Sequence, residues 1–176
     1  MNIWHDIERE RVSVDEFVAF IEISKGEKCK YELDKETGLL IFDRLLSTSM
    51  VYPANYGFIP KTLGGDGDPL DVLVLASEPL MSGCLVECRP IGMIVMIDDG
   101  ERDEKIIAVA KKDPFYAKVK TLDDLPKHTF DEMSHFFKRY KELQNKVTEI
   151  KGVEGIESAQ VIIEESINNY KAEYDS

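Results

Sequence analysis

Short apolar runs, rich in β-branched residues, recur along the first two-thirds of the chain. The run FVAFIE at residues 17–22 is typical of a strand. Tyr31–Leu33 and Leu39–Phe42 flank the turn-rich segment Asp34–Gly38, and this arrangement predicts a hairpin. Three further runs have the composition of buried strands: Asp71–Ala76, Leu85–Ile97 and Lys105–Ala110. Because no helical pattern separates these runs, the sequence favours a small antiparallel barrel or sandwich.

Apolar residues recur at three- and four-residue spacing in the last third of the chain, which indicates two amphipathic helices. The first is predicted from Phe130, Met133, Phe136, Phe137, Tyr140 and Leu143. Thr129 and Glu132 stand at its start and fit a capping box. The second is predicted from Ala159, Ile162, Ile163, Ile167 and Tyr170, with Ser158 as its N-cap. We therefore expect one α+β domain over residues 1–176.

The charge balance is acidic, with 22 basic against 34 acidic residues and a formal net charge of −12. This sign argues against a nucleic-acid-binding protein, which presents a basic face, and against docking on an anionic membrane. Most of the excess lies in the two end segments, residues 1–16 and 149–176, and this part serves solubility. Net charge alone therefore does not identify a partner.

The cysteines and the apolar stretches bear on the compartment. Three cysteines, Cys29, Cys84 and Cys88, leave one unpaired in any disulfide scheme and favour buried free thiols in a reducing cytosol. The first residues have no apolar core of the kind found in a secretory signal. The longest nearly apolar stretch, Pro90–Ile97, is far shorter than the ~20 residues of a membrane span. We expect a cytoplasmic protein that does not bind membranes.

One acidic motif carries the clearest chemical signal. Residues 64–71 read GGDGDPLD, with carboxylates at Asp66, Asp68 and Asp71 directly before an apolar strand. Hard oxygen ligands of this kind select Mg²⁺, Mn²⁺ or Ca²⁺, although a solvated acidic turn is an equal alternative for the motif taken alone. An EF-hand is excluded because Leu70 and Asp71 occupy the fifth and sixth loop positions. No P-loop motif occurs.

A second acidic segment and a set of cations and phenols could complete such a site. Residues 98–105 read DDGERDEK between two apolar strands, which by itself predicts an exposed hairpin loop. Two acidic loops at strand ends could converge on one cation cluster. Arginine, lysine and tyrosine side chains can bind phosphate, and six of them occupy strand or helix positions: Lys30, Arg44, Tyr52, Tyr56, Tyr140 and Lys141. Each of these alone is more often a surface cation or a core phenol.

Taken together, these motifs give a resemblance to a known family. Asp66–Asp71 is similar to the signature of the soluble family I inorganic pyrophosphatases. The similarity extends over about residues 5–170, and the chain resembles the short prokaryotic form. The other matching segments are the strand with Glu22, Lys30-Tyr-Glu32, Asp43-Arg44, Tyr52-Pro-Ala-Asn-Tyr56-Gly, the pattern of Asp98, Asp103 and Lys105, and His135-Phe-Phe-Lys-Arg-Tyr140-Lys141.

The resemblance implies hydrolysis of pyrophosphate with several Mg²⁺ ions per site, for which Mn²⁺ or Zn²⁺ could substitute. It implies that Asp66, Asp71 and Asp103 bind the tightest ion, and that Asp71 also reaches a second. Asp98 and Asp103 would hold a further ion, and Glu22 would act through water on another. The implied donor set therefore consists of carboxylates alone, as hard divalent cations prefer.

The resemblance also implies roles in proton transfer and phosphate binding. Asp68 would accept the proton of the attacking water, and Tyr56 would orient that water. The phosphates would be gripped by Lys30, Arg44, Tyr56, Tyr140 and Lys141. Glu32, Tyr52 and Lys105 would support the same cavity.

The implied fold is a five-stranded OB-like antiparallel β-barrel with two C-terminal α-helices, assembled as a homohexamer of two trimers. In two places the chain departs from the family pattern. Asp99 stands where glutamate is frequent, and Arg139 stands where a second histidine often follows His135. The second departure leaves the details of hexamer assembly open. Two alternatives remain: a non-catalytic module that binds divalent cations, and a phosphohydrolase acting on an organic diphosphate.

Overall fold

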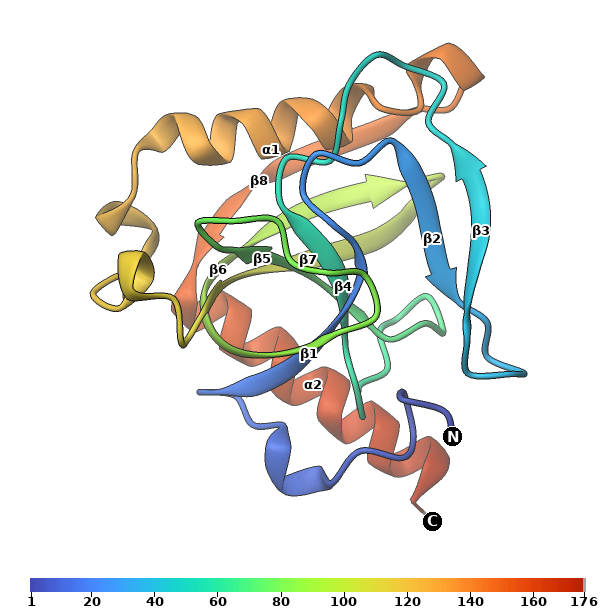
Figure 1. Ribbon diagram of the computed structural model, residues 1–176, viewed down its shortest axis with the longest axis vertical. Helices are drawn as coiled ribbons and strands as arrows, with labels where there is room; N and C mark the ends of the chain where they lie inside the picture. Colours follow the sequence, from blue (N-terminus) through green and yellow to red (C-terminus); the bar gives the residue numbers. More distant parts are fainter. Residues whose placement is uncertain (176) are drawn as a thin grey trace.

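The computed structural model describes residues 1–175 and consists of a strand-rich body with two long helices (Figure 1). The strands are β1 (Phe17–Ile23), β2 (Cys29–Leu33), β3 (Leu40–Leu45), β4 (Asn55–Ile59), β5 (Leu70–Leu75), β6 (Leu85–Asp98), β7 (Glu101–Ala110) and β8 (Thr148–Gly155). The helices are α1 (Lys127–Arg139) and α2 (Ile156–Tyr174). Four single-turn 3₁₀ helices occur at Arg9–Arg11, Pro114–Tyr116, Leu122–Asp124 and Glu142–Gln144.

Five of the strands close into a ring. The six-stranded sheet has the order β1-β4-β5-β7-β6-β8, and an additional pairing of β1 with β6 closes the first five strands on themselves. β8 lies outside the ring along β6, and β2 with β3 forms a separate two-stranded sheet. This arrangement confirms the predicted OB-like α+β fold. One pairing differs from an all-antiparallel ring, because β5 and β7 run parallel to each other.

Both faces of the ring strands are buried, which explains their nearly continuous apolar sequences. Leu73, Ile94 and Ile107 belong to one core cluster, which also contains the apolar face of α1. Their neighbours Val72, Met93 and Ile106 belong to a second cluster, which includes the apolar face of α2. Because side chains alternate along a strand, each ring strand contributes to both cores. The two helices thus cover different cores, as their separation in Figure 1 shows.

The helix starts differ from the sequence prediction. α1 begins at Lys127 with Pro126 as N-cap and has no side-chain cap, so the predicted capping box at Thr129 is wrong. α2 begins at Ile156 immediately after β8, with Gly155 as N-cap, and Ser158 lies inside the helix. Because β8 ends at Gly155 and α2 begins at the next residue, no polar capping residue lies between them. Leu143, predicted on the first helix, lies exposed in the 3₁₀ turn after it.

The second acidic segment is mostly strand rather than an exposed loop. Asp99 and Gly100 have φ angles of 51° and 82° and form the tight turn between β6 and β7. Left-handed values at both positions are typical of a two-residue hairpin turn whose twist matches its strands. The strand pairing continues through Asp98 opposite Glu101, so Asp103 and Lys105 lie within β7. Lys105, which begins the predicted strand Lys105–Ala110, is buried, and β7 starts four residues before that predicted strand.

Cys29, Cys84 and Cys88 all have free thiols, but only Cys88 is buried; Cys29 and Cys84 are partly exposed, so the expectation of buried thiols is wrong for these two. Burial raises the pKa of the Cys88 thiol. No helix within residues 1–175 has the length and apolar character to cross a membrane.

Candidate active site

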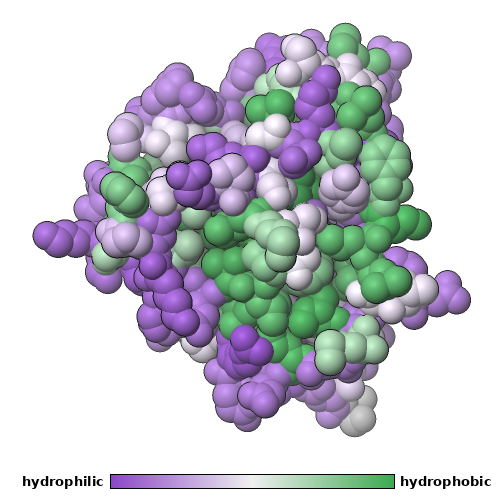
Figure 2. Space-filling model, viewed as in Figure 1, coloured by the Kyte–Doolittle hydropathy of each residue, from purple (hydrophilic) through white to green (hydrophobic). Residues whose placement is uncertain are grey.

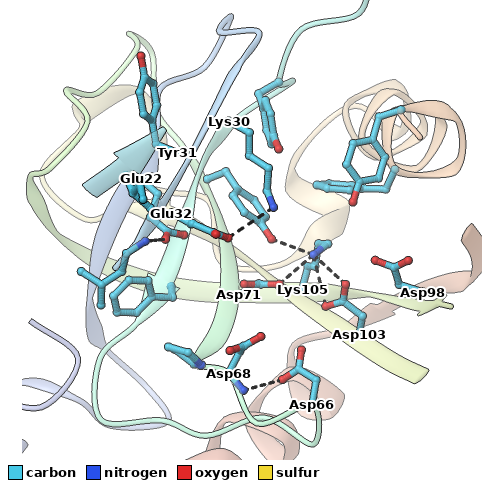
Figure 3. A pocket seen from close by; sticks show the side chains of 18 of the residues that line it. Glu22, Lys30, Tyr31, Glu32, Asp66, Asp68, Asp71, Asp98, Asp103 and Lys105 are labelled. Atoms are coloured by element: carbon cyan, nitrogen blue, oxygen red, sulfur yellow. Dashed lines mark hydrogen bonds and ion pairs between the residues drawn. The ribbon is translucent and has the colours of Figure 1, made fainter. Parts of the chain in front are cut away.

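A cavity of about 650 Å³ opens between the ring, the β2–β3 hairpin and the residues that follow α1. All but one of the predicted site residues line it: Glu22, Lys30, Glu32, Tyr52, Tyr56, Asp66, Asp68, Asp71, Asp98, Asp103, Lys105, Tyr140 and Lys141. Figure 3 shows the carboxylates of Asp66, Asp71 and Asp103 directed toward the same space. The two acidic segments therefore converge on one cavity, as the sequence suggested they could.

The parallel pairing of β5 with β7 builds the floor of this cavity. Asp71 of β5 is the direct register partner of Lys105 of β7. Asp103 stands two residues before Lys105 and therefore shares its face of the strand. The same face thus receives two carboxylates and one ammonium group. Asp98 joins them from the end of β6, and Asp66 and Asp68 from the loop before β5.

Lys105 is the centre of the charge network on this floor. Its side chain is 2% exposed, and its Nζ lies 2.9 Å from Asp71 Oδ2, 3.2 Å from Asp103 Oδ2 and 2.9 Å from the Tyr56 hydroxyl. Burial alone would lower the pKa of Lys105, but the surrounding negative charges outweigh it and hold that pKa well above its usual value. The lysine is therefore a fixed cation between two carboxylates.

Burial raises the pKa of three of the acids, Asp66, Asp71 and Glu22. Desolvation raises the pKa of Asp71 to about 6, although Lys105 pulls it down. Desolvation also raises the pKa of Glu22 to about 8, despite the hydrogen bond that the Leu33 backbone N–H donates to it at 2.8 Å. Burial therefore favours the protonated form of Glu22. The charge of Lys30 lowers the pKa of Glu22, but this effect is smaller than that of desolvation.

Other cations line the walls, each paired with an acid. Lys30 Nζ lies 3.1 Å from Asp43 Oδ2 and 3.8 Å from Glu32 Oε2. Lys141, which follows α1, lies 2.7 Å from Asp98 Oδ2. Burial works against the charged form of Lys141, but Tyr140 and Asp98 prevail and raise the pKa of its ammonium group. Both walls therefore present positive charge toward the acidic floor.

Arg44 is the predicted residue that does not line the cavity. It stands opposite Lys30 in the β2–β3 pairing, and its Nη1 donates to Asp43 Oδ2 at 2.7 Å. Its Nε and Nη2 are buried and have no hydrogen-bond partner among the described residues. Asp43 thus bridges Lys30 and Arg44, a role that the sequence analysis did not assign to it.

The phenols form the third part of the cavity wall. Tyr52, Tyr56 and Tyr140 pack in one aromatic cluster with Phe136 and Phe137 of α1. Desolvation raises the pKa of both Tyr52 and Tyr56, so these phenols stay protonated. The ring contacts hold the hydroxyl groups of the three tyrosines in position, and the same rings form the cavity wall next to α1.

Lys35 also lines the cavity, although the sequence analysis passed over it. Its ammonium group forms an ion pair with the carboxylate of Asp68. Lys35 lies in the turn between β2 and β3, where polar residues are usual, so its position in the sequence gave no sign of a site residue. Only the three-dimensional placement of that turn reveals the contact.

Carboxylate oxygens are suitable ligands for a hard divalent cation, but in this structure lysine side chains form ion pairs with four of these carboxylates. Lys105 lies between Asp71 and Asp103, Lys141 contacts Asp98, and Lys35 contacts Asp68. Within residues 1–175, no group of three or more acidic, histidine or cysteine side chains is arranged to hold a metal ion. The all-oxygen donor set around the cavity nevertheless fits a hard divalent cation.

Comparison with known proteins gives one consistent family. Residues 19–171 match the family model described as inorganic pyrophosphatase. The inorganic pyrophosphatase of Halalkalibacterium halodurans is 50% identical over 153 residues, which cover 87% of this chain and 94% of that protein. The inorganic pyrophosphatase of Synechocystis is 50% identical over 151 residues, covering 86% and 89%.

Solved structures agree with the sequence relatives. The Helicobacter pylori inorganic pyrophosphatase superposes with a TM-score of 0.88 at 47% identity, covering 93% of this chain and 99% of that one. The Thermus thermophilus enzyme gives a TM-score of 0.91 at 34% identity, covering 97% and 99%. The fold, the clustering of the predicted residues and these matches agree, and the chain belongs to the inorganic pyrophosphatase family.

Proposed function

We propose that this protein hydrolyses inorganic pyrophosphate to two orthophosphates. The supporting observation is that a single cavity combines an acidic floor with cationic walls. The acids suit divalent cations, and Lys30 and Lys141 suit the phosphates of an anionic substrate. A module that only binds cations would need no such phosphate clamp, so the pairing of the two sets favours an enzyme.

Mg²⁺ is the cofactor that we propose, in several ions per site, with Mn²⁺ or Zn²⁺ as possible substitutes. Asp66, Asp71 and Asp103 would hold the tightest ion, and Asp71 would also reach a second. Asp98 with Asp103 would hold a further ion, and Glu22 would act on another through water. When bound, such ions lower the pKa of a coordinated water and neutralise charge on phosphate oxygens. Lys105 would then balance the negative charge of Asp71 and Asp103 from below.

The proton of the attacking water goes to Asp68 in this proposal. Asp68 stands at the open side of the cavity, in the loop before β5, where a water molecule can reach it. The water oxygen bonds to one phosphorus atom, and the bridging P–O bond breaks, so that two orthophosphates leave. Tyr56 orients the water from a hydroxyl that the Lys105 ammonium holds at 2.9 Å. In this proposal Asp68 accepts the proton of the water, and Tyr56 positions the water.

The clamp on the two phosphates would consist of Lys30, Arg44, Tyr140 and Lys141, with Tyr56 at its centre. Arg44 does not line the cavity, so its guanidinium group would have to turn toward the phosphates; its Nε and Nη2, which have no partner among the described residues, would then donate to them. Glu32 and Tyr52 support the clamp, because Glu32 lies 3.8 Å from Lys30 Nζ and the Tyr52 ring packs on Tyr56.

We further propose a cytoplasmic homohexamer built from two trimers. The free thiols are consistent with a reducing compartment. Exposed apolar side chains support association: Leu39, Ile41, Phe42 and Leu45 lie on or beside β3. Figure 2 shows apolar atoms gathered on this side of the molecule and across the adjoining face. Sedimentation velocity would measure the assembly, and a monomer at micromolar concentration would contradict the hexamer.

The activity test compares three substrates under identical conditions. Orthophosphate release is measured with pyrophosphate, a nucleoside triphosphate and tripolyphosphate, each with Mg²⁺ and again with excess chelator. With Mg²⁺, we expect orthophosphate release from pyrophosphate and not from the other two substrates. With excess chelator, we expect no release from any of the three. Absence of release with Mg²⁺ would favour the cation-binding module. Faster release from the nucleotide would favour the organic-diphosphate alternative.

A further inference from the structure

The first residues of the chain pack against the turn that joins β2 and β3. Figure 1 shows the N-terminal end beside this turn. The Asn2 side-chain amide donates to the backbone carbonyl of Lys35 at 2.9 Å. A Cβ at Gly38 would lie 2.1 Å from the Met1 carbonyl oxygen, and Gly38 has a φ of 77°. The turn therefore fits against the N-terminal segment, which lies outside residues 19–171 matched by the family model.

Trp4 joins this segment to the opposite wall of the cavity. Its side chain is buried, and its indole Nε1 donates to the Thr62 carbonyl at 2.8 Å. The Lys61 backbone N–H donates to the Trp4 carbonyl at 3.0 Å. Thr62 in turn accepts from the Leu70 backbone N–H, at the start of β5. Trp4 is thus bonded directly to the start of the loop that carries Asp66 and Asp68, and Thr62 connects that start to the end of the loop.

Lys35 connects the two walls at the mouth of the cavity. Its ammonium group lies 5.3 Å from the centroid of the Trp4 ring, within the range of a cation–π contact. The same group pairs with Asp68, and the two side chains are 51% and 56% exposed. An exposed ion pair of this kind is weak. A diphosphate that brings several negative charges to the mouth would compete with Asp68 for the ammonium group.

We propose that Lys35 is a substrate-binding residue that exchanges Asp68 for a phosphate when pyrophosphate enters, and that Trp4 and Asn2 position it for this exchange. This inference rests on the proposed function. It adds a cation to the clamp and gives the N-terminal segment a part in substrate binding. The exchange also releases the Asp68 carboxylate at the moment when the substrate arrives.

The kinetic test uses two matched lysines. Lys35→Met removes the ammonium group at the mouth, whereas Lys61→Met removes one that lies over the Tyr170 ring and does not line the cavity. A contact made equally to substrate and transition state affects KM alone. We therefore expect Lys35→Met to raise KM for pyrophosphate about tenfold with kcat within about twofold, and Lys61→Met to change neither.

The outcomes separate this inference from the proposed function. Wild-type protein that does not hydrolyse pyrophosphate overturns the proposed function itself. Active wild-type protein with an unchanged KM in Lys35→Met leaves the proposed function standing and overturns the role of Lys35. A similar rise in KM in Lys61→Met would also overturn it, because the effect would then reflect overall charge.

The positioning role is tested by combining substitutions. Trp4→Leu should raise KM about threefold to fivefold, and adding it to Lys35→Met should raise KM no further. If KM of the double variant rose by the product of the two single increases, Trp4 would act independently of Lys35, and the positioning role would be overturned. Because Trp4 is buried, Asn2→Ala serves as the second variant: it removes the hydrogen bond to the Lys35 carbonyl and the one that Asn2 Oδ1 accepts from the Trp4 backbone N–H, and it leaves the Trp4 and Lys35 side chains in place. It should show a smaller rise of the same kind.

A binding measurement needs no turnover. Trp4 is the single tryptophan of the chain, so its fluorescence reports on Lys35 directly. Imidodiphosphate lacks the cleavable bridging oxygen of pyrophosphate. Added together with Mg²⁺, it should shift the Trp4 fluorescence emission of wild-type protein and of Lys61→Met. Lys35→Met should bind the probe more weakly by calorimetry and show no shift at saturation. An equal shift in Lys35→Met would contradict the exchange.

Discussion

Replacing Lys105 by methionine tests the charge balance on the cavity floor. Methionine keeps a similar length and volume but removes the ammonium group. Asp71 and Asp103, whose side chains are 23% and 16% exposed, would then lose their cation. The Tyr56 hydroxyl would lose the donor at 2.9 Å. Nothing else in the packing needs to change, so the effect isolates the electrostatic contribution of Lys105.

The expected loss of stability follows from this geometry. Removing one partner of a buried ion pair costs about 3–5 kcal/mol, because it leaves an uncompensated charge. Both carboxylates retain some contact with solvent, so the lower end of that range, about 3 kcal/mol, applies to the metal-free protein. For a chain of 150–250 residues, each kcal/mol shifts Tm by roughly 2–4 °C, which gives a drop of about 6–12 °C.

Urea unfolding followed by circular dichroism, with a chelator present, measures this loss at pH 8. Lys105→Arg keeps the charge and is the matched control, expected to lose much less stability. Mg²⁺ should then restore more stability to Lys105→Met than to wild type, because the freed carboxylates can bind it. A free energy of unfolding for Lys105→Met within about 1 kcal/mol of wild type would refute the reasoning.

Three further outcomes are expected. Asp68→Asn should lower kcat by ~10²–10⁴-fold while leaving Mg²⁺ affinity by calorimetry unchanged; loss of metal binding would instead identify a ligand. Gly57→Ala places a Cβ 1.8 Å from the Phe20 carbonyl oxygen and should strongly lower Tm, whereas Gly65→Ala, with nothing within 4 Å, should not; equal Tm values would contradict this. Burial lowers the pKa of His5, so stability should fall as pH drops through its unfolded-state value of about 6.5. His5→Phe should flatten that slope in thermal melts from pH 5 to 8, and an unchanged slope would argue against this cause.

Much of the fold could be predicted from apolar patterning, because the ring strands are buried on both faces. β5, β6 and β7 were predicted within a few residues for this reason. Two strands were missed, β4 and β8. β4 is buried throughout, but it is only five residues long and contains Asn55 and Gly57, which have low strand propensity. In β8, Gly152 and Gly155 interrupt a stretch in which charged residues alternate with apolar ones. The parallel pairing of β5 with β7 could not be predicted, because ring closure and not local sequence determines which strands become neighbours.

For the candidate site, too, local sequence patterns predicted some residues, whereas others become neighbours only in the folded structure. The spacing of Asp66, Asp68 and Asp71 identified one acidic segment, but its convergence with Asp103 depends on the register between β5 and β7. No local pattern encodes that register. Lys35 was missed because a lysine in a turn is ordinary, and its contact with Asp68 requires the hairpin to reach across the cavity.

The parallel pairing also has a consequence for the order of folding. Asp71 and Lys105 lie 34 positions apart in sequence, and β6 runs between them. The β6–β7 hairpin can form locally, but it then carries Lys105 without its carboxylate from β5. Contacts of such long sequence separation form late, because the loop must close first. The contact of Lys105 with the carboxylates of both strands is therefore a property of the closed ring, and no fragment that lacks β5 or β7 can form it.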